Sequence, residues 1–183
     1  METTHPIELN QPSWTQQIII RNVTRADPPA PAWDGEYKHF RRLYAQAFER
    51  AQLGLSRLWL AELPGRGLIG QAFVQLNCDF PELANGYDRA YLYGFRVRPA
   101  YRNCGIGSQI LRTIEQNLLS NHFCWLTLNV AKQNVAAYRL YERLGFRRIG
   151  EDPGIWHYID DQGKRHDMHE PAWRMQKRLG SSD

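Results

Sequence analysis

One stretch of the sequence decides the fold: Val97-Arg98-Pro99-Ala100-Tyr101-Arg102-Asn103-Cys104-Gly105-Ile106-Gly107-Ser108. It follows a strand-like run and precedes a helical pattern, so it is read as a strand end, a tight loop and a helix start. Gly105 and Gly107 let the backbone approach a ligand because they carry no Cβ. The free N–H groups and the positive dipole at the helix start form a cradle for phosphate oxygens. Arg102 adds a charged fork at its mouth.

Two familiar phosphate-binding motifs do not fit this stretch. A dinucleotide fingerprint needs glycine where Ile110 stands, and a P-loop ends in Gly-Lys-Ser/Thr where this chain has Gly107-Ser108-Gln109. A glycine-rich turn without a ligand remains an alternative for this stretch taken alone.

The charge around this loop is of one sign. Between Asp88 and Glu115 the charged residues are all arginines, namely Arg89, Arg96, Arg98, Arg102 and Arg112. This pattern favours an anionic ligand nearby, and a solvated basic face is the alternative.

A second signature is the run Asn134-Val135-Ala136-Ala137-Tyr138-Arg139-Leu140-Tyr141-Glu142-Arg143-Leu144-Gly145-Phe146. Asn134 suits a helix N-cap, because its side chain can accept from the first helical N–H groups. Tyr141 follows two turns later on the same face, about 10 Å along the axis. The alternative is that Asn134 only caps the helix and Tyr141 only packs against the sheet.

Together the two signatures resemble the GCN5-related N-acetyltransferase (GNAT) family. The family loop Arg/Gln-x-x-Gly-x-Gly/Ala corresponds to 102–107, and the family helix, with Asn, Ala, Leu-Tyr and Gly-Phe, corresponds to 134–146. The resemblance is specific over about 68–150 and architectural over 17–67. No motif covers 1–16 or 150–183.

The resemblance implies a cofactor, acetyl-CoA as cosubstrate, lying in a cleft where strand 91–97 splays from strand 123–130. It implies that Phe95 and Val97 pair through their backbones with the pantetheine arm, which Asn134 also binds. Tyr141 then protonates the leaving thiolate. The pyrophosphate is expected on the backbone amides of the loop, namely Asn103, Cys104, Gly105, Ile106, Gly107 and Ser108, beside Arg102.

The fold class predicted is α/β: a single GNAT-like domain with a mostly antiparallel central sheet, splayed at the cofactor cleft and flanked by helices. Residues 1–16 are predicted to be an extended N-terminal arm and 17–179 the N-acetyltransferase domain. Strands are expected at 17–23, 57–63, 68–76, 91–97, 123–130, 146–149 and 172–177, and helices at 37–51, 108–120 and 135–144.

Composition limits the class further. A chain of 183 residues, 43% hydrophobic and 23% charged, is expected to form one globular domain. No apolar run approaches the roughly 18 residues of a membrane span, and METTHPIELN shows no secretory signal. The three cysteines, Cys78, Cys104 and Cys124, form no CxxC pair and fit reduced thiols in a cytoplasmic protein, with Cys104 a small filler and Cys124 in the core.

Other partners are not favoured by the sequence. A net charge of +4 is too mild to indicate nucleic acid, and the tryptophans are interpreted as core or acceptor-pocket walls. His157, His166, Asp167 and His169 match no common metal-site spacing, so no metal is predicted.

The expected general base is missing. Some family members carry glutamate five residues before the asparagine, where this chain has Asn129, and strand 91–97 has no carboxylate. Asp79, Glu82 and Asp88 of the 77–90 connection are weak candidates, and release of the proton through ordered water is the alternative.

The function predicted is N-acetyltransfer from acetyl-CoA to a primary amine of a small molecule or protein by direct attack. The alternative is a non-catalytic acyl-CoA-binding module of the same fold. The acceptor is expected to meet residues 33–56, the 77–90 loop and the C-terminal segment, and a homodimer is left open.

Overall fold

The computed structural model describes residues 12–27 and 38–180. Its central sheet has seven strands in the order β1-β2-β3-β4-β5-β9-β6. The strands, in that order, are β1 (Ile19–Asn22), β2 (Ser56–Leu63), β3 (Gly67–Gln75), β4 (Arg89–Val97), β5 (Trp125–Ala131), β9 (Ala172–Arg178) and β6 (Arg147–Asp152). Every pairing is antiparallel except β4 with β5, so the predicted α/β class with a mostly antiparallel sheet is confirmed.

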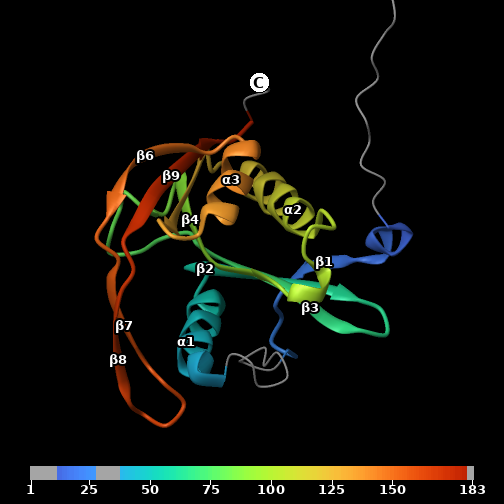
Figure 1. Ribbon diagram of the computed structural model, residues 1–183, viewed down its shortest axis with the longest axis horizontal. Helices are drawn as coiled ribbons and strands as arrows, with labels where there is room; N and C mark the ends of the chain where they lie inside the picture. The colour runs from blue at the N-terminus through green and yellow to red at the C-terminus, as the bar shows by residue number, and fades with distance from the viewer. Residues whose placement is uncertain (1–11, 28–37, 181–183) are drawn as a thin grey trace, which may run out of the picture.

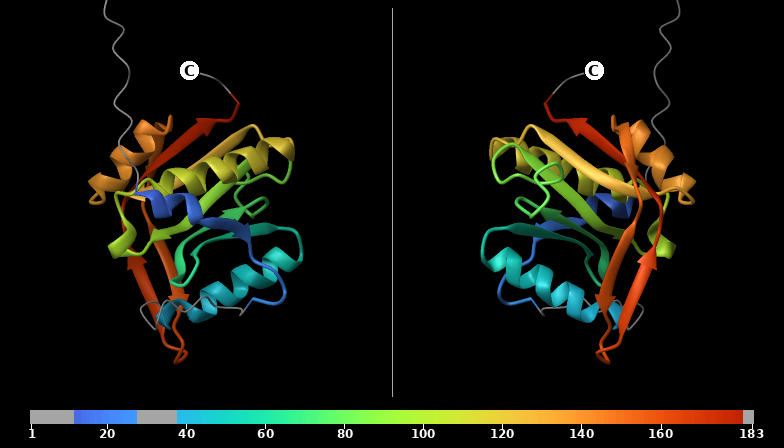
Figure 2. Two further views of the ribbon diagram at one scale, coloured as in Figure 1. Left: turned by 90° about the vertical axis from the view of Figure 1, so that its right-hand side faces the viewer. Right: turned by 90° about the vertical axis from the view of Figure 1, so that its left-hand side faces the viewer.

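Helices cover both faces of this sheet (Figures 1 and 2). The helices α2 (Ile106–Ser120) and α3 (Val135–Arg143) lie on one face, and α1 (Arg41–Gln52) lies on the other. The apolar stripe of α2, with Ile110, Ile114 and Leu118 at helical spacing, is buried in the main core. A smaller core forms where Tyr44 and Ala47 of α1 pack on Leu58 and Phe73. No helix of the described ranges is long and apolar enough to cross a membrane.

The sheet splits between β4 and β5. These two strands pair only from Arg89↔Trp125 to Leu92↔Leu128, and beyond Leu92 the edge of β4 that faces β5 has no strand partner within 12–27 and 38–180. The predicted splay is therefore confirmed, and it opens toward the loop that begins α2.

A bulge in β4 lies at the split. The register with β3 shifts between Gln71↔Arg96 and Phe73↔Tyr93, so that Gly94 and Phe95 together face one residue. Gly94 takes a left-handed φ of 58°, and the buried Gln71 amide donates to its carbonyl at 3.2 Å. After the bulge, Phe95 packs toward α2 and Arg96 points to α1, where it donates to the Tyr44 hydroxyl at 2.9 Å.

A hairpin that the sequence analysis did not predict follows β6. It consists of β7 (Ile155–Ile159) and β8 (Arg165–His169), and it continues the β6–β9 pair beyond the sheet to α1 (Figure 1). At the junction the Glu170 N–H donates to the Gly154 carbonyl at 2.9 Å. Phe40, in the 3-10 helix η2 (Lys38–Phe40), packs edge-on against Tyr158 at 4.9 Å between ring centroids.

Two local predictions were wrong. Within the predicted extended arm, Ser13–Gln17 forms the 3-10 helix η1, because Thr15 turns back to donate to the Pro12 carbonyl and is buried. Cys124 is exposed rather than in the core, because it lies before the paired residues of β5. Residues 1–11 of the arm and the proline-rich stretch 28–32 lie outside the described residues.

Candidate active site

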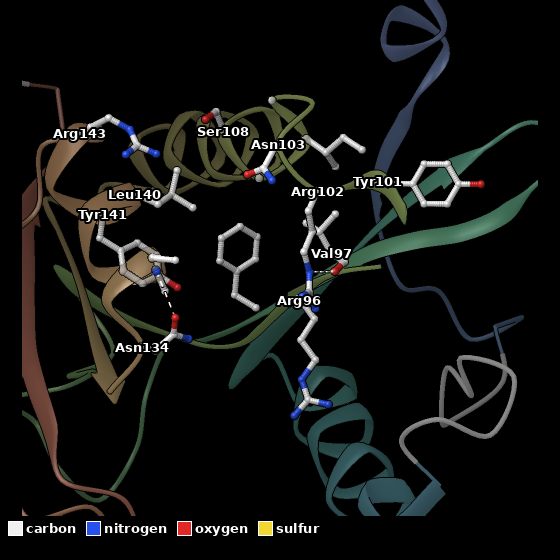
Figure 3. A pocket seen from close by; sticks show the side chains of 16 residues that line it. Arg96, Val97, Tyr101, Arg102, Asn103, Ser108, Asn134, Leu140, Tyr141 and Arg143 are labelled. Atoms are coloured by element: carbon white, nitrogen blue, oxygen red, sulfur yellow. Dashed lines mark hydrogen bonds between the residues drawn. The ribbon is translucent and has the colours of Figure 1, made fainter. Parts of the chain in front are cut away.

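A cavity of about 670 Å³ lies at the open end of the split. Figure 3 shows the two signatures facing each other across it, with Asn134 and Tyr141 of the asparagine helix on one side and Arg102 on the other. The cavity is lined by Phe95, Arg96, Val97, Tyr101, Arg102, Asn103, Gly105, Ile106, Gly107, Ser108, Asn134, Ala136, Ala137, Leu140, Tyr141 and Arg143. Cys104 is the one residue of the predicted cofactor set that does not line it; its partly buried side chain packs against the core instead.

The loop is shaped to present its backbone. Asn103 and Gly105 both have left-handed φ values, 60° and 79°, which turn the chain sharply before α2 begins at Ile106. The described residues offer no backbone acceptor to the N–H groups of Gly105 to Ser108. A Cβ on Gly107 would come within 3.2 Å of the Phe95 ring, so glycine there lets the loop pack closely on β4. Arg102 braces the loop by donating from Nε to the Val97 carbonyl at 2.9 Å.

Asn134 caps α3 as predicted. Its Oδ1 accepts from the Ala137 N–H at 3.2 Å. Because the carbonyl oxygen is used by the cap, the amide N–H₂ group is the part of this side chain that remains to donate to a ligand.

Tyr141 is a buried residue that lines the cavity. Its ring packs edge-on to Phe146 at 5.7 Å and near Phe95 at 6.3 Å, and only 8% of the residue is exposed. Burial raises the pKa of its hydroxyl well above the usual value, so the group stays protonated. The hydroxyl has no hydrogen-bond partner among the described residues and is not one of their buried unsatisfied atoms, so it remains accessible to a ligand in the cavity.

A second cavity, of about 340 Å³, adjoins the first beneath Tyr141. It is lined by Leu92, Tyr93, Gly94, Phe95, Arg96, Asn129, Val130, Ala131, Asn134, Ala137, Tyr141 and Glu170. Asn129 lies here and accepts a long hydrogen bond of 3.4 Å from Arg174 Nε, and Arg174 is paired with Asp152 at 2.6 Å. The two cavities therefore meet at Asn134 and Tyr141.

Three charged residues at these cavities were not among the predicted site residues. Arg143 shares a helix face with Leu140 and Ala136 at i−3 and i−7, so helical spacing alone could have identified it. Arg96 is turned toward α1 by the β4 bulge, which the sequence does not indicate. Glu170 comes from outside both signatures and carried no signal.

The loop acids are placed away from the site. Asp79, Glu82 and Asp88 line neither cavity. The Asp88 carbonyl accepts from the N–H of Trp125 at 2.9 Å, which places it at the closed end of the split. The hypothesis of a base from this loop therefore has no geometric support.

His157, His166 and His169 belong to the β7–β8 hairpin. His166 is hydrogen-bonded to Asp160 at 2.8 Å and stacks on Tyr158 at 4.9 Å, and no group of three or more metal-binding side chains occurs in the part of the chain that the structure describes.

The Trp173 ring is contacted by the Lys132 and Arg148 cations, at 4.1 and 3.7 Å from its centroid. Trp33 lies outside the described residues.

Comparison with known proteins agrees with this geometry. The model of the acetyltransferase (GNAT) family matches residues 20–146, and the chain belongs to this family. It is 32% identical over 85 residues to the spermine/spermidine N(1)-acetyltransferase of Bacillus subtilis, covering 46% of this chain and 55% of that one. The chain spans about half the length of the curated relatives that it matches first.

Two solved structures share the fold. A GNAT family acetyltransferase from Elizabethkingia anophelis with acetyl-CoA bound has a TM-score of 0.64 at 16% identity, and the match covers 89% of this chain and 99% of that one. The ribosomal-protein-S18-alanine N-acetyltransferase from Escherichia coli has a TM-score of 0.64 at 22% identity, covering 91% of this chain and 96% of that one.

Proposed function

We propose that this protein is an N-acetyltransferase that moves an acetyl group from acetyl-CoA to a primary amine. The observation that carries the proposal is the largely buried Tyr141, whose protonated hydroxyl has no partner among the described residues and which lies where the two cavities meet. The larger cavity suits the cofactor and the smaller one the acceptor.

The phosphate loop holds the pyrophosphate. The amides of Asn103 to Ser108, with the dipole of the 15-residue helix α2 behind them, donate to its oxygens. Arg102 and Arg143 supply positive charge from opposite walls of the cavity (Figure 3). The arginine-only stretch of the sequence thus contributes Arg102 to the binding of an anion.

The split in the sheet holds the pantetheine arm. Beyond Leu92, the free edge of β4 at Phe95 and Val97 offers backbone groups to an extended chain as a further strand would. The Asn134 amide donates from the other side. When bound, acetyl-CoA supplies a thioester carbonyl that an amine can attack.

Tyr141 acts as the general acid. Since burial keeps its hydroxyl protonated, it can donate its proton to the sulfur that leaves. The similarity to the spermine/spermidine N(1)-acetyltransferase named above is consistent with a primary amine as acceptor.

The second candidate function is an acyl-CoA-binding module without turnover, favoured by Asn129 standing where some relatives carry glutamate. An assay of CoA release separates the two. The panel consists of spermine, spermidine, thialysine and a peptide with N-terminal alanine, and free thiol is measured. Release above the amine-free background supports the enzyme, and none, with binding intact, supports the module.

The first prediction concerns cofactor binding. Acetyl-CoA at a hundredfold excess over Kd stabilises the native state by about 2.7 kcal/mol, because it binds only the folded protein. Thermal melts measure the shift. The double variant Arg102→Ala with Gly105→Val is expected to abolish it, because it removes the brace and strains the left-handed turn.

The matched control for that variant is Arg66→Ala with Gly65→Val in the turn between β2 and β3. Gly65 also has a left-handed φ, 75°, and both residues are exposed and remote from the cavities. The control protein keeps the acetyl-CoA shift. A wild-type melting curve that millimolar acetyl-CoA leaves unchanged contradicts the cofactor assignment.

A further inference from the structure

The acceptor cavity contains one carboxylate. Among the described residues that line the two cavities, Glu170 is the sole acid, whereas Arg96, Arg102 and Arg143 are cations. Asn129 lines the same small cavity but cannot take a proton. An amine of pKa near 10 enters as an ammonium ion and must lose a proton before it attacks. Glu170 is therefore the group at the site with the chemistry to accept it.

Glu170 is held in place by the junction between the sheet and the β7–β8 hairpin. Its N–H donates to the Gly154 carbonyl at 2.9 Å, and Pro171 follows it. A Cβ on Gly154 would lie 1.8 Å from the Glu170 carbonyl oxygen, so the two backbones pack in direct contact. The position of Glu170 is thus set by the backbone and not by a flexible loop.

The carboxylate is oriented but only partly engaged. Trp156 Nε1 donates to Oε2 of Glu170 at 3.3 Å. The other oxygen, Oε1, has no partner among the described residues, and the side chain is half-buried. An ammonium group in the small cavity can therefore donate to Oε1 without displacing an existing bond.

We propose that Glu170 binds the ammonium group of the acceptor and is the general base of the reaction. This rests on the proposed function. Glu170 takes one proton from the ammonium ion, directly or through one water, and later releases it to solvent. The neutral nitrogen then forms the bond to the acetyl carbon as the carbon–sulfur bond breaks. Sulfur takes the proton of Tyr141, and the tyrosinate takes the second nitrogen proton.

Other ionisable groups lie at the small cavity or in the elements beside it, and the test must separate them from Glu170. Tyr93, Arg96 and Tyr141 line the cavity, the Asp152–Arg174 pair contacts it through Asn129, and Tyr158 and His166 belong to the hairpin. Comparison of pH profiles between the wild type and a Glu170 variant removes their common contribution.

The test is Glu170→Gln, which keeps the size of the side chain and an oxygen for Trp156. With the panel amine that turns over fastest, we expect kcat/KM at pH 7 to fall by about 10²-fold or more. The deficit shrinks as pH rises toward the pKa of the amine, because a neutral amine needs no base. The acetyl-CoA-induced thermal shift stays at the wild-type value.

Glu142→Gln is the matched control. It removes the same charge from an exposed position next to Tyr141 that lines neither cavity, and it keeps wild-type kcat/KM. If Glu170→Gln has wild-type activity, or a deficit that does not change with pH, Glu170 is not the general base, and the proposed function still stands. A wild type that binds acetyl-CoA but acetylates no amine overturns the proposed function and the base together.

Discussion

At the scale of single residues, the site depends on a tyrosine whose surroundings favour one protonation state. Tyr141 is enclosed by Phe95 and Phe146, and loss of water around its hydroxyl raises the pKa far above any working pH. A phenol with so high a pKa carries its proton at every working pH. In the proposed reaction this hydroxyl gives its proton to the sulfur as the carbon–sulfur bond breaks.

Tyr141→Phe is therefore expected to lower kcat by about 10²–10⁴-fold, because it removes the proton donor and keeps the ring. Acetyl-CoA affinity, measured by the thermal shift, changes little. Tyr138→Phe, on the same helix but lining neither cavity, is the control and keeps wild-type kcat. If binding and turnover weaken equally in Tyr141→Phe, the residue is only a packing residue.

At the scale of elements, the bulge in β4 decides which side of the sheet Phe95 and Arg96 face. Phe95 lies on the side of α2 and supports the phosphate loop at Gly107, and Arg96 lies on the side of α1, where it contacts Tyr44 and the Phe40 ring. Without the extra residue the two side chains would exchange sides. One extra residue in β4 therefore sets the walls of both cavities.

Gly94→Ala tests the bulge. A Cβ at Gly94 would lie 2.9 Å from the buried Phe73 ring, and the left-handed φ adds strain of about 1–2 kcal/mol. Gly65→Ala carries the same φ strain with nothing within 4 Å. Urea unfolding is expected to show a larger loss for Gly94→Ala, by about 1 kcal/mol or more. Equal losses in the two variants would falsify the claim that Phe73 requires glycine there.

The elements that could be predicted from the sequence are those whose signal is local. The helix predicted over 108–120 has apolar residues at helical spacing, and the helix predicted over 135–144 is followed by Gly145, a residue type that favours a helix end. The strands predicted over 57–63 and 68–76 are separated by Pro64-Gly65-Arg66-Gly67, which is typical of a turn. The β7–β8 hairpin was missed although β7 (Ile155–Ile159) is made of isoleucine and aromatic residues apart from His157, a composition that favours a strand. Its partner β8 (Arg165–His169) is mostly polar, so no second strand signal marked the pair as a hairpin. Glu170 was missed for a different reason, since only the pairing of β9 with β5 brings it near Tyr141.

At the scale of the whole molecule, part of the free energy of unfolding is expected to be lost in alkali, because β4 partly buries two tyrosines. Tyr91 and Tyr93 stack on each other with ring centroids 6.0 Å apart, and desolvation raises the pKa of each to about 12. In the unfolded chain they ionise near pH 10. The folded state therefore holds more protons above pH 10, and the free energy of unfolding falls there by up to about 1.4 kcal/mol per pH unit per tyrosine.

Urea unfolding at pH 9, 10 and 11 measures this fall, which is absent below pH 10, where both states are protonated. Tyr91→Phe is expected to make the fall in the free energy of unfolding less steep, because one of the two partly buried tyrosines no longer ionises. Tyr87→Phe, at a residue that is 70% exposed, is the control and leaves the slope as it is. If the free energy of unfolding falls with pH equally steeply in the wild type and in Tyr91→Phe, Tyr91 does not contribute to the loss of stability in alkali.

The order of strands in the sheet also has a consequence for synthesis. β9 lies between β5 and β6, yet it is made after both. As the chain leaves the ribosome, both signatures and the phosphate loop emerge while the neighbouring edges of β5 and β6 still lack the strand that joins them. The nascent protein thus passes through a stage with all its motifs made and its sheet open. Only the arrival of Ala172–Arg178 closes the sheet, and with it the wall that brings Glu170 to Tyr141.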